Sequence, residues 1–459
     1  MRRRASSPRS PASLVSARNR RELMRRGRSG GFQFAHEANS HSNSVATESC
    51  SAAKEPKNDA AQGTLFRSFF AAGFECSTHV RHSGVRLDLV RSTAHDKFAL
   101  LDYLRLAQQG LCVAREGIRW HLVEREPDRY DFESLMSVVQ AAQTTNTQVI
   151  WDLCHFGWPE HLDLFSSQFV TSLARYGATV AQWLVREMNE PPFIVPVNEI
   201  SFFSWAAGDE GSMFPFIKER GFELKKHLAR ASIETMKAIW AAVPEARFVQ
   251  VDPIIHVVAS SKHPEEIPDA EAYRLTQYQA WDMLCGRLCP ELGGEPRFLD
   301  IVGVNFYPHN QWIYDLKNRR RIRKFTPLSF RHPLHRPFRE MLQEVHQRYR
   351  RPLLVAETGA ESVRRAGWLR YVCEESRQAM LNGVPLEAIC LYPILNHPGW
   401  IDDRHCHNGL WDYPDEEGNR KVYKPLEREL KRWRRVFERG QLPRVQAIND
   451  RAVSKQTIS

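Results

Sequence analysis

Two short polar segments of this chain hold the residue types that acid–base chemistry needs. Asn198 and Glu199 follow the apolar residues 193–197, and Glu357 follows the apolar residues 353–356. A strand buried on both faces should be apolar nearly throughout, so a carboxylate at its end needs a reason. The carboxyl ends of such strands are where α/β proteins bind ligands. Two glutamates so placed indicate paired carboxylate chemistry, although either one alone is equally well explained as a helix cap or a solvated loop residue.

The segments that must position these glutamates alternate between short apolar and longer amphipathic patterns. Eight strands are predicted at 69–74, 117–120, 148–153, 193–197, 248–251, 301–305, 353–356 and 388–392. Helices are predicted at 95–109, 132–143, 168–188, 223–242, 271–288, 338–349, 365–382 and 424–438. This alternation predicts an α/β protein with a single (β/α)8 TIM barrel. An open doubly wound sheet would also need a glycine-rich phosphate turn, and the sequence has no such motif.

The positive charge of the chain is concentrated at its N-terminus. The net charge is +10, and residues 1–63 hold 12 Lys or Arg against five Asp or Glu, which leaves +3 for the remainder. We expect residues 1–63 to be a disordered Arg- and Ser-rich tail, 64–440 to be the barrel and 441–459 to be a C-terminal tail. Because the barrel is nearly balanced in charge, no nucleic-acid partner is expected.

The sequence favours a cytoplasmic protein. Its apolar runs are shorter than the roughly 18 residues of a membrane span, and its N-terminus lacks the apolar segment of a secretory signal. Nine cysteines are scattered without CxxC spacing, which suits buried thiols better than a disulfide framework. We therefore expect no membrane partner, and the oligomeric state stays open.

Polar and aromatic residues gather at the predicted strand ends. Aromatic faces stack on sugar rings, while amides and carboxylates bind hydroxyl groups. A ring of such residues around one rim predicts a carbohydrate substrate. The residues that we expect to bind it are Glu75, Arg119, His155, Asn198, Asn305, Tyr307 and Trp400.

Hydrolysis of a glycosidic bond with retention requires one carboxyl to protonate the leaving oxygen and a second, about 5–5.5 Å away, to attack the anomeric carbon. Asn198-Glu199 and Glu357-Thr358-Gly359 resemble the two signatures of clan A glycoside hydrolases, and the chain is most similar to family 1 β-glucosidase-like proteins over about residues 66–415. The resemblance implies a β-glycosidase that hydrolyses O-glycosidic bonds by double displacement. It makes Glu199 the general acid and base and Glu357 the nucleophile.

The resemblance also assigns supporting residues. Segment 117–120 resembles a strand-two motif whose arginine, here Arg119, contacts the nucleophile, and segment 303–307 resembles a strand-six motif whose tyrosine, here Tyr307, hydrogen-bonds it. A structural ion pair and an ordinary core aromatic are the respective alternatives. The resemblance further implies that Asn198 binds the sugar 2-hydroxyl and that His155 and Trp400 line the glycone subsite.

The chain departs from the family at two sugar-binding positions. Glu75-Cys76-Ser77 stands where family members carry a glutamine, and His397-Pro398-Gly399-Trp400 replaces an Asn-x-Glu-Trp stretch. Both positions hold the hydroxyls that distinguish one sugar from another. The catalytic assignment therefore carries over better than the identity of the sugar, and Glu75 either takes part of the glutamine's role or is a solvated or ion-paired carboxylate at the rim.

No metal and no cofactor are expected, because retaining glycosidases need none. Segment 402–407 offers carboxylate, imidazole and thiolate ligands, but its spacing matches no zinc pattern, which favours a polar loop beside the site. Two alternatives to the glycosidase stay open: a transglycosylase of the same fold, and a catalytically silent barrel that binds carbohydrate or acts as a scaffold.

Overall fold

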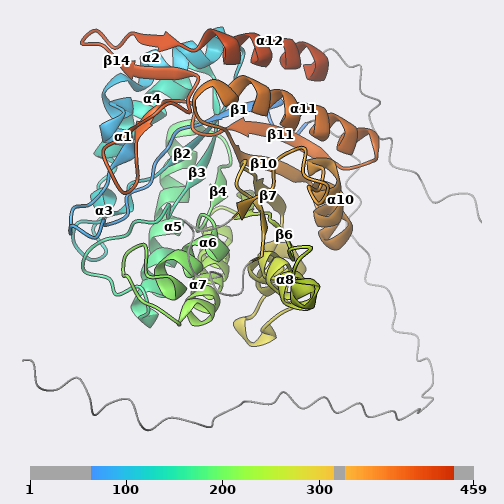
Figure 1. Cartoon of the computed structure of the whole chain (residues 1–459). Helices are drawn as coiled ribbons and strands as arrows, with labels where there is room; N and C mark the ends of the chain where they lie inside the picture. The colour runs from blue at the N-terminus through green and yellow to red at the C-terminus, as the bar shows by residue number, and fades with distance from the viewer. Residues whose placement is uncertain (1–63, 315–325, 439–459) are drawn as a thin grey trace, which may run out of the picture. The chain divides into compact units, whose positions relative to one another are not determined.

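The computed structural model describes residues 64–314 and 326–438, and the predicted tails 1–63 and 441–459 lie outside these residues. Eight parallel strands close into a barrel in the order β1-β11-β10-β7-β5-β4-β3-β2, which confirms the predicted fold (Figure 1). These strands are β1 (Phe70–Gly73), β2 (Val113–Gly117), β3 (Gln148–Asp152), β4 (Phe193–Val195), β5 (Arg247–Pro253), β7 (Ile301–Asn305), β10 (Leu353–Thr358) and β11 (Leu386–Leu391).

Helices surround the barrel. The helix α5 packs along α7 on one side, while α10, α11 and α12 follow one another on another side. The helices are α1 (Leu89–Ser92), α2 (His95–Gln108), α3 (Trp120–Val123), α4 (Glu133–Thr145), α5 (Ser167–Met188), α6 (Ile200–Ser204), α7 (Gly221–Ala242), α8 (Ile267–Leu275), α9 (Gln279–Leu284), α10 (Phe338–Tyr349), α11 (Arg365–Leu381) and α12 (Lys424–Glu438). The predicted helix 271–288 is thus divided between α8 and α9.

Local sequence explains how the long helix α5 begins and ends. At the start of α5 the Ser166 hydroxyl accepts a hydrogen bond from the Phe169 backbone amide, 3.2 Å away, which satisfies one of the amides left free at a helix N-terminus. The helix ends at Asn189, which takes the left-handed conformation that asparagine tolerates well. Between these caps its apolar residues face the barrel and α7.

Small sheets of two or three strands lie outside the barrel. The strands β6 (His256–Val258), β8 (Gln311–Ile313) and β9 (Thr326–Pro327) form one of them. The strands β12 (His397–Pro398) and β13 (His405–Cys406) form a second, and β14 (Trp411–Pro414) and β15 (Arg420–Val422) a third. The second and third of these sheets follow β11, the eighth strand of the barrel, in the chain.

Successive side chains of a barrel strand point to opposite faces of the sheet, so the barrel has a hydrophobic core on each face. Side chains that point outward join the helices in the larger core, while those that point inward fill the barrel. The inner core holds Phe66, Ala71, Val113, Ile150, Phe193, Val195, Val249, Val251, Ile301, Leu354, Ala356, Ala388, Cys390 and Tyr392. Val113 and Arg115 are two residues apart in β2, so the Arg115 guanidinium enters the barrel on the same side as this apolar filling.

The predicted position of the second strand was wrong by four residues at its start. The strand β2 spans Val113–Gly117, not 117–120, and every residue in it is buried, including Arg115 and Glu116. The two adjacent charged residues explain the error, because the pattern expected of a buried strand is apolar. Residues 118 and 119 instead connect β2 to α3, whose first residue is Trp120.

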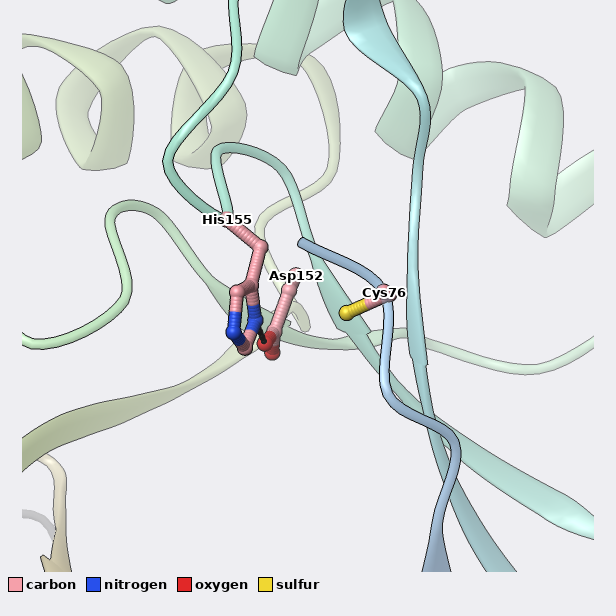
Figure 2. Close-up of side chains that lie close together, drawn as sticks. All are labelled: Cys76, Asp152 and His155. Carbon is pink, nitrogen blue, oxygen red and sulfur yellow. Dashed lines mark hydrogen bonds and ion pairs between the residues drawn. The ribbon is translucent and has the colours of Figure 1, made fainter. Parts of the chain in front are cut away.

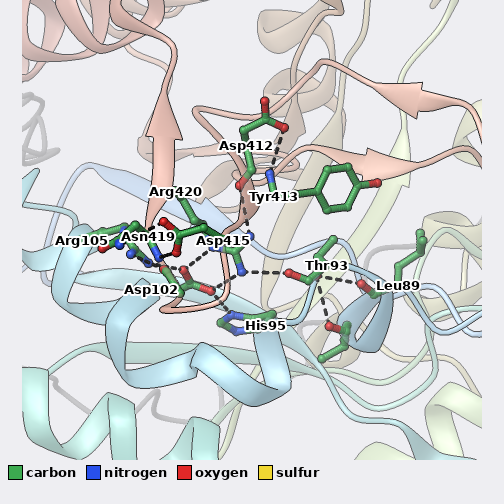
Figure 3. Close-up of polar contacts among 12 residues, drawn as sticks. Leu89, Thr93, His95, Asp102, Arg105, Asp412, Tyr413, Asp415, Asn419 and Arg420 are labelled. Carbon is green, nitrogen blue, oxygen red and sulfur yellow. Dashed lines mark hydrogen bonds and ion pairs between the residues drawn. The ribbon is translucent and has the colours of Figure 1, made fainter.

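A buried ion cluster joins α2 to the β14–β15 hairpin (Figure 3). The Arg420 guanidinium donates to both carboxylate oxygens of Asp102, at 2.6 and 2.9 Å. The His95 ring lies between two carboxylates, with Nδ1 2.9 Å from Asp102 and Nε2 3.0 Å from Glu116. Burial alone would lower the pKa of His95, but these carboxylates raise it to about 9. His95 is therefore a buried cation, and it connects α2 to β2.

This cluster predicts a loss of stability at alkaline pH. A histidine whose pKa rises from 6.5 to about 9 on folding contributes fully below the unfolded pKa, and the contribution disappears as pH rises through the folded pKa. The expected loss between pH 6.5 and 9.5 is about 3 kcal/mol. Urea unfolding across this range should show it in the native protein and not in His95→Gln. His263→Gln, which alters an exposed histidine, should keep the native slope, and equal slopes in all three proteins would contradict the assignment.

Candidate active site

The two glutamates lie at the carboxyl-terminal rim of the barrel, as predicted. Glu357 belongs to β10, where its Cα pairs with that of Asn305 on β7. Glu199 follows β4, and its backbone amide donates to the Val251 carbonyl of β5 at 3.1 Å. Glu199 also has a positive φ of 46°, which is uncommon for a residue with a side chain. Such conformations concentrate at functional sites, where the surrounding structure holds them in place.

Glu199 is buried in an environment that favours its protonated form. Burial and the neighbouring Glu357 carboxylate raise the pKa of Glu199 well above its usual range. The Asn305 amide opposes this effect, because its Nδ2 donates to Oε1 of Glu199 at 2.7 Å. A carboxyl that keeps its proton near neutral pH is suited to act as a general acid.

Glu357 receives charge-assisted and neutral hydrogen bonds that suit a carboxylate. Nη1 of Arg115 donates to Oε1 of Glu357 at 2.7 Å, and the Tyr307 hydroxyl donates to Oε2 at 2.8 Å. Burial, followed by the carboxylates of Glu357, Glu199 and Glu75, raises the pKa of Tyr307, so its hydroxyl keeps the proton that it donates. The expected contact between Tyr307 and Glu357 is therefore present.

Arg115 connects several strand ends. Its Nε and Nη2 donate to the two carboxylate oxygens of Asp152 at 3.0 and 2.7 Å, which is the bidentate geometry that guanidinium groups favour. Nη2 also donates to Oδ1 of Asn198 at 2.7 Å. Side chains from β2, β3, β10 and the segment after β4 thus meet at one buried cation.

The predicted role of Arg119 was wrong. Nη1 of Arg119 lies 3.1 Å from the carboxylates of Asp88 and Asp96, outside the network around Glu357. The error follows from the misplaced second strand, because the arginine that enters the barrel belongs to Val113–Gly117. The available signal was a pair of adjacent charged residues, Arg115 and Glu116, with apolar residues before and after it, since an ionised side chain is buried in a strand only where it is paired.

His155 completes the polar network beside Arg115. Its Nδ1 lies 2.8 Å from Oδ2 of Asp152, and its Nε2 lies 3.2 Å from Nδ2 of Asn198. Oδ1 of Asn198 is occupied by Arg115, so Nδ2 is the atom that faces the ring. Burial alone would lower the pKa of His155, but Cys76 and the Asp152 carboxylate beside Nδ1 raise it well above its usual range.

Cys76, Asp152 and His155 form a buried group of possible metal ligands (Figure 2), with ligand atoms within 4.8 Å of one another. Their environment does not suit a cation. Both oxygens of Asp152 already accept hydrogen bonds from the Arg115 guanidinium, and burial raises the pKa of the Cys76 thiol. This group is better suited to hold polar side chains in place than to bind a metal.

Glu75 and Trp400 approach the site from the two segments in which the chain departs from family 1. Glu75 is buried, accepts a hydrogen bond from the Ser77 amide at 3.0 Å, and is near enough to raise the pKa of Tyr307. The Trp400 ring packs edge-on against His79 and Phe156, with centroids 5.4 and 5.6 Å apart. Both remain predicted sugar-binding residues.

Asp252, at the end of β5, is a further acidic residue near the site that the sequence analysis missed. Its carboxylate accepts hydrogen bonds from the Ser201 amide at 3.0 and 3.2 Å. Burial raises the pKa of Asp252 to about 7, and its charge contributes to the raised pKa of Glu199. The signal was an aspartate directly after an apolar strand, the same pattern that identified Glu199 and Glu357.

Comparisons with known proteins show similarity in fold. No protein-family model and no curated protein sequence matches the chain. The AHE enzyme from Alicyclobacillus herbarius matches with 15% identity and a TM-score of 0.67 over 81% of this chain and 99% of that chain. A family 1 β-glucosidase from Thermotoga maritima matches with 14% identity and a TM-score of 0.64, over 81% and 97% of the two chains. Its complex with glucoimidazole gives 14% and 0.65, over 82% and 99%. The chain therefore shares the fold of these proteins, a (β/α)8 TIM barrel.

The different surroundings of Arg115 and Arg119 predict different losses in the free energy of unfolding when each arginine is replaced. Arg115→Met leaves the buried carboxylates of Asp152 and Glu357 without their cation and should cost about 3–5 kcal/mol. Arg119→Met removes a pairing with aspartates that are 19% and 27% exposed and should cost about 1 kcal/mol or less. Urea unfolding followed by circular dichroism compares them, and equal losses in the two variants would refute the central position of Arg115.

Proposed function

We propose that this protein is a retaining β-glycosidase, similar to β-glucosidases, that hydrolyses O-glycosidic bonds through Glu199 and Glu357. The observation that carries the proposal is the difference between the two carboxyl environments. Glu357 accepts hydrogen bonds from the Arg115 guanidinium and the Tyr307 hydroxyl, whereas burial and the charge of Glu357 raise the pKa of Glu199. A carboxyl that keeps its proton, next to a carboxylate bound by a guanidinium, is what acid catalysis and nucleophilic attack require together.

In the first step of the proposed reaction, a carboxylate oxygen of Glu357 attacks the anomeric carbon. The bond from that carbon to the leaving oxygen breaks, and Glu199 transfers its proton to that oxygen. In the second step Glu199, now ionised, takes a proton from water as the water oxygen attacks the anomeric carbon and releases Glu357. Arg115 and Tyr307 bind the Glu357 carboxylate before attack and after release, so they orient it for both steps.

The substrate in this proposal is a carbohydrate whose glycone lies against Asn198, His155, Asn305, Trp400 and Glu75. The glucosidases of similar fold include one solved with glucoimidazole, which supports a sugar ligand of that general size. We place the activity in the cytoplasm, because the eight cysteines among the described residues are free thiols. Separately, no helix in residues 64–314 and 326–438 has the length and apolarity to span a membrane.

Trapping the intermediate tests the proposal. Incubation with a panel of 2-deoxy-2-fluoro glycosides should yield a glycosyl adduct on Glu357, because the fluorine slows release of the sugar from the enzyme. Intact-protein mass spectrometry and peptide mapping detect the adduct.

Variants of the two glutamates provide the controls for trapping. Glu357→Gln should form no adduct, and Glu199→Gln should lose about 100- to 10,000-fold in turnover of substrates whose leaving group needs a proton. Sugars that bind without any adduct would favour the silent barrel, and products transferred to a sugar acceptor instead of water would favour the transglycosylase.

The pH dependence of activity tests the assignment of the acid. Activity should fall at alkaline pH as Glu199 loses its proton. Asn305→Ala removes a hydrogen bond that stabilises the ionised carboxylate, so the alkaline limb of kcat/KM should move to higher pH. Asp252→Asn removes a nearby negative charge that raises the same pKa, so the limb should move to lower pH. Shifts in the same direction would show general disturbance of the site and would contradict the assignment.

A further inference from the structure

The hairpin of β12 and β13 carries His405 and His407, which the proposed reaction does not use. Its strands pair antiparallel, with His397 opposite Cys406 and Pro398 opposite His405, and its turn contains Trp400. His405 and His407 are two residues apart, so in an extended segment their side chains project from the same face. Cys406 projects from the other face, where it is buried.

Three potential metal ligands converge beside this hairpin. The rings of His405 and His407 lie face to face, with centroids 4.2 Å apart and an interplanar angle of 19°. Nε2 of His405 lies 3.0 Å from Oδ1 of Asp412, which belongs to β14. One ligand atom from each of the three residues lies within 4.8 Å of the others. Two imidazole nitrogens and a carboxylate oxygen at this spacing can share one ion.

The carboxylate is held in place by groups that do not themselves belong to the ligand set. Nδ2 of Asn396 donates to Oδ1 of Asp412 at 3.0 Å, and the Tyr413 amide donates to the same oxygen at 2.9 Å. The Asn396 side chain is itself fixed, because its Oδ1 accepts from the Gly409 amide at 2.8 Å. Hydrogen bonds of this kind orient the carboxylates of known metal sites before an ion binds.

The site is open to ions from solvent. The side chains of His405 and Asp412 are 39% and 33% exposed, and His407 is also exposed. This distinguishes it from the buried group of Cys76, Asp152 and His155, where a guanidinium already occupies the carboxylate. Two imidazoles with one carboxylate are ligands that Zn²⁺ accepts at three of four tetrahedral positions, with water at the fourth.

We propose that His405, His407 and Asp412 bind a single divalent transition-metal ion of the Zn²⁺ type, and that the ion fastens the hairpin 397–407 to β14. The sequence analysis favoured a polar loop here because segment 402–407 alone has no zinc spacing. The third ligand comes from the following strand, Asp412. Because the turn of this hairpin contains Trp400, the ion would fix the position of an aromatic residue that we expect to bind sugar. Metal binding itself does not depend on the proposed glycosidase activity.

Zinc binding to the full chain, prepared without a polyhistidine tag and stripped with a chelator, tests the site. Competition between the protein and a chromophoric chelator should show one saturable Zn²⁺ site, which His405→Ala, His407→Ala and Asp412→Asn each weaken at least tenfold. His263→Ala, an exposed histidine elsewhere, and Cys76→Ser should bind as the native protein does. Unchanged affinity in the first three variants, loss of binding in Cys76→Ser, or no saturable binding would overturn the proposal.

Two further measurements separate the site from its effect on the hairpin. The Co²⁺-substituted protein should show tetrahedral absorption bands without thiolate charge transfer, and thiolate bands would place the ion on a cysteine instead. Amide hydrogen exchange of residues 397–407 should slow on addition of Zn²⁺ in the native protein and not in His405→Ala. Binding without slower exchange would overturn the claim that the ion fastens the hairpin. Neither measurement uses glycosidase activity, so failure of the proposed function would be seen separately.

Discussion

The buried guanidinium of Arg115 is the interaction on which the rest of this site depends. It binds Asp152 through two parallel hydrogen bonds and also reaches Glu357 and Asn198. Removing an ion from water costs several kcal/mol, which only well-placed partners offset. Here the partners come from three other segments of the barrel wall, β3, β10 and the residues after β4, so the charge is compensated only when these segments come together around β2. The contacts that hold the site together are therefore also contacts between the strands of the barrel.

The same cation determines how the two carboxyls differ. Glu357 receives the direct charge of Arg115, whereas Glu199 receives a neutral amide donor from Asn305. Since Glu357 and Asp252 both raise the pKa of Glu199, an ionised Glu357 helps to keep Glu199 protonated. The barrel thus places two chemically identical side chains in different environments, and the environment of Glu199 raises its pKa.

A second buried ion cluster, on the outer face of the barrel, connects β2 to α2 and to the β14–β15 hairpin. The cation His95 links Glu116 of β2 to Asp102 of α2, and Arg420 of the β14–β15 hairpin shares Asp102. Because Arg115 and Glu116 are adjacent in one strand, their side chains project to opposite faces of the sheet. A single dipeptide therefore connects the inner network to the outer one, and it accounts for two buried charges in a strand of five residues.

The sequence by itself determined the barrel, seven of its eight strands to within a few residues, and the positions of Glu199, Glu357 and Tyr307. These follow from local information, since apolar runs of strand length and polar residues at their ends are visible without any knowledge of contacts. Tertiary structure decided which arginine enters the barrel. Arg115 lies inside a strand that was hard to predict because a charged residue is unusual in a buried strand. Its burial is favourable only because other strands supply its hydrogen-bond partners. Tertiary structure also placed Asp252 close enough to Glu199 to raise the pKa of that carboxyl. The two residues are 53 positions apart in the chain, and such a contact arises from packing rather than from sequence spacing.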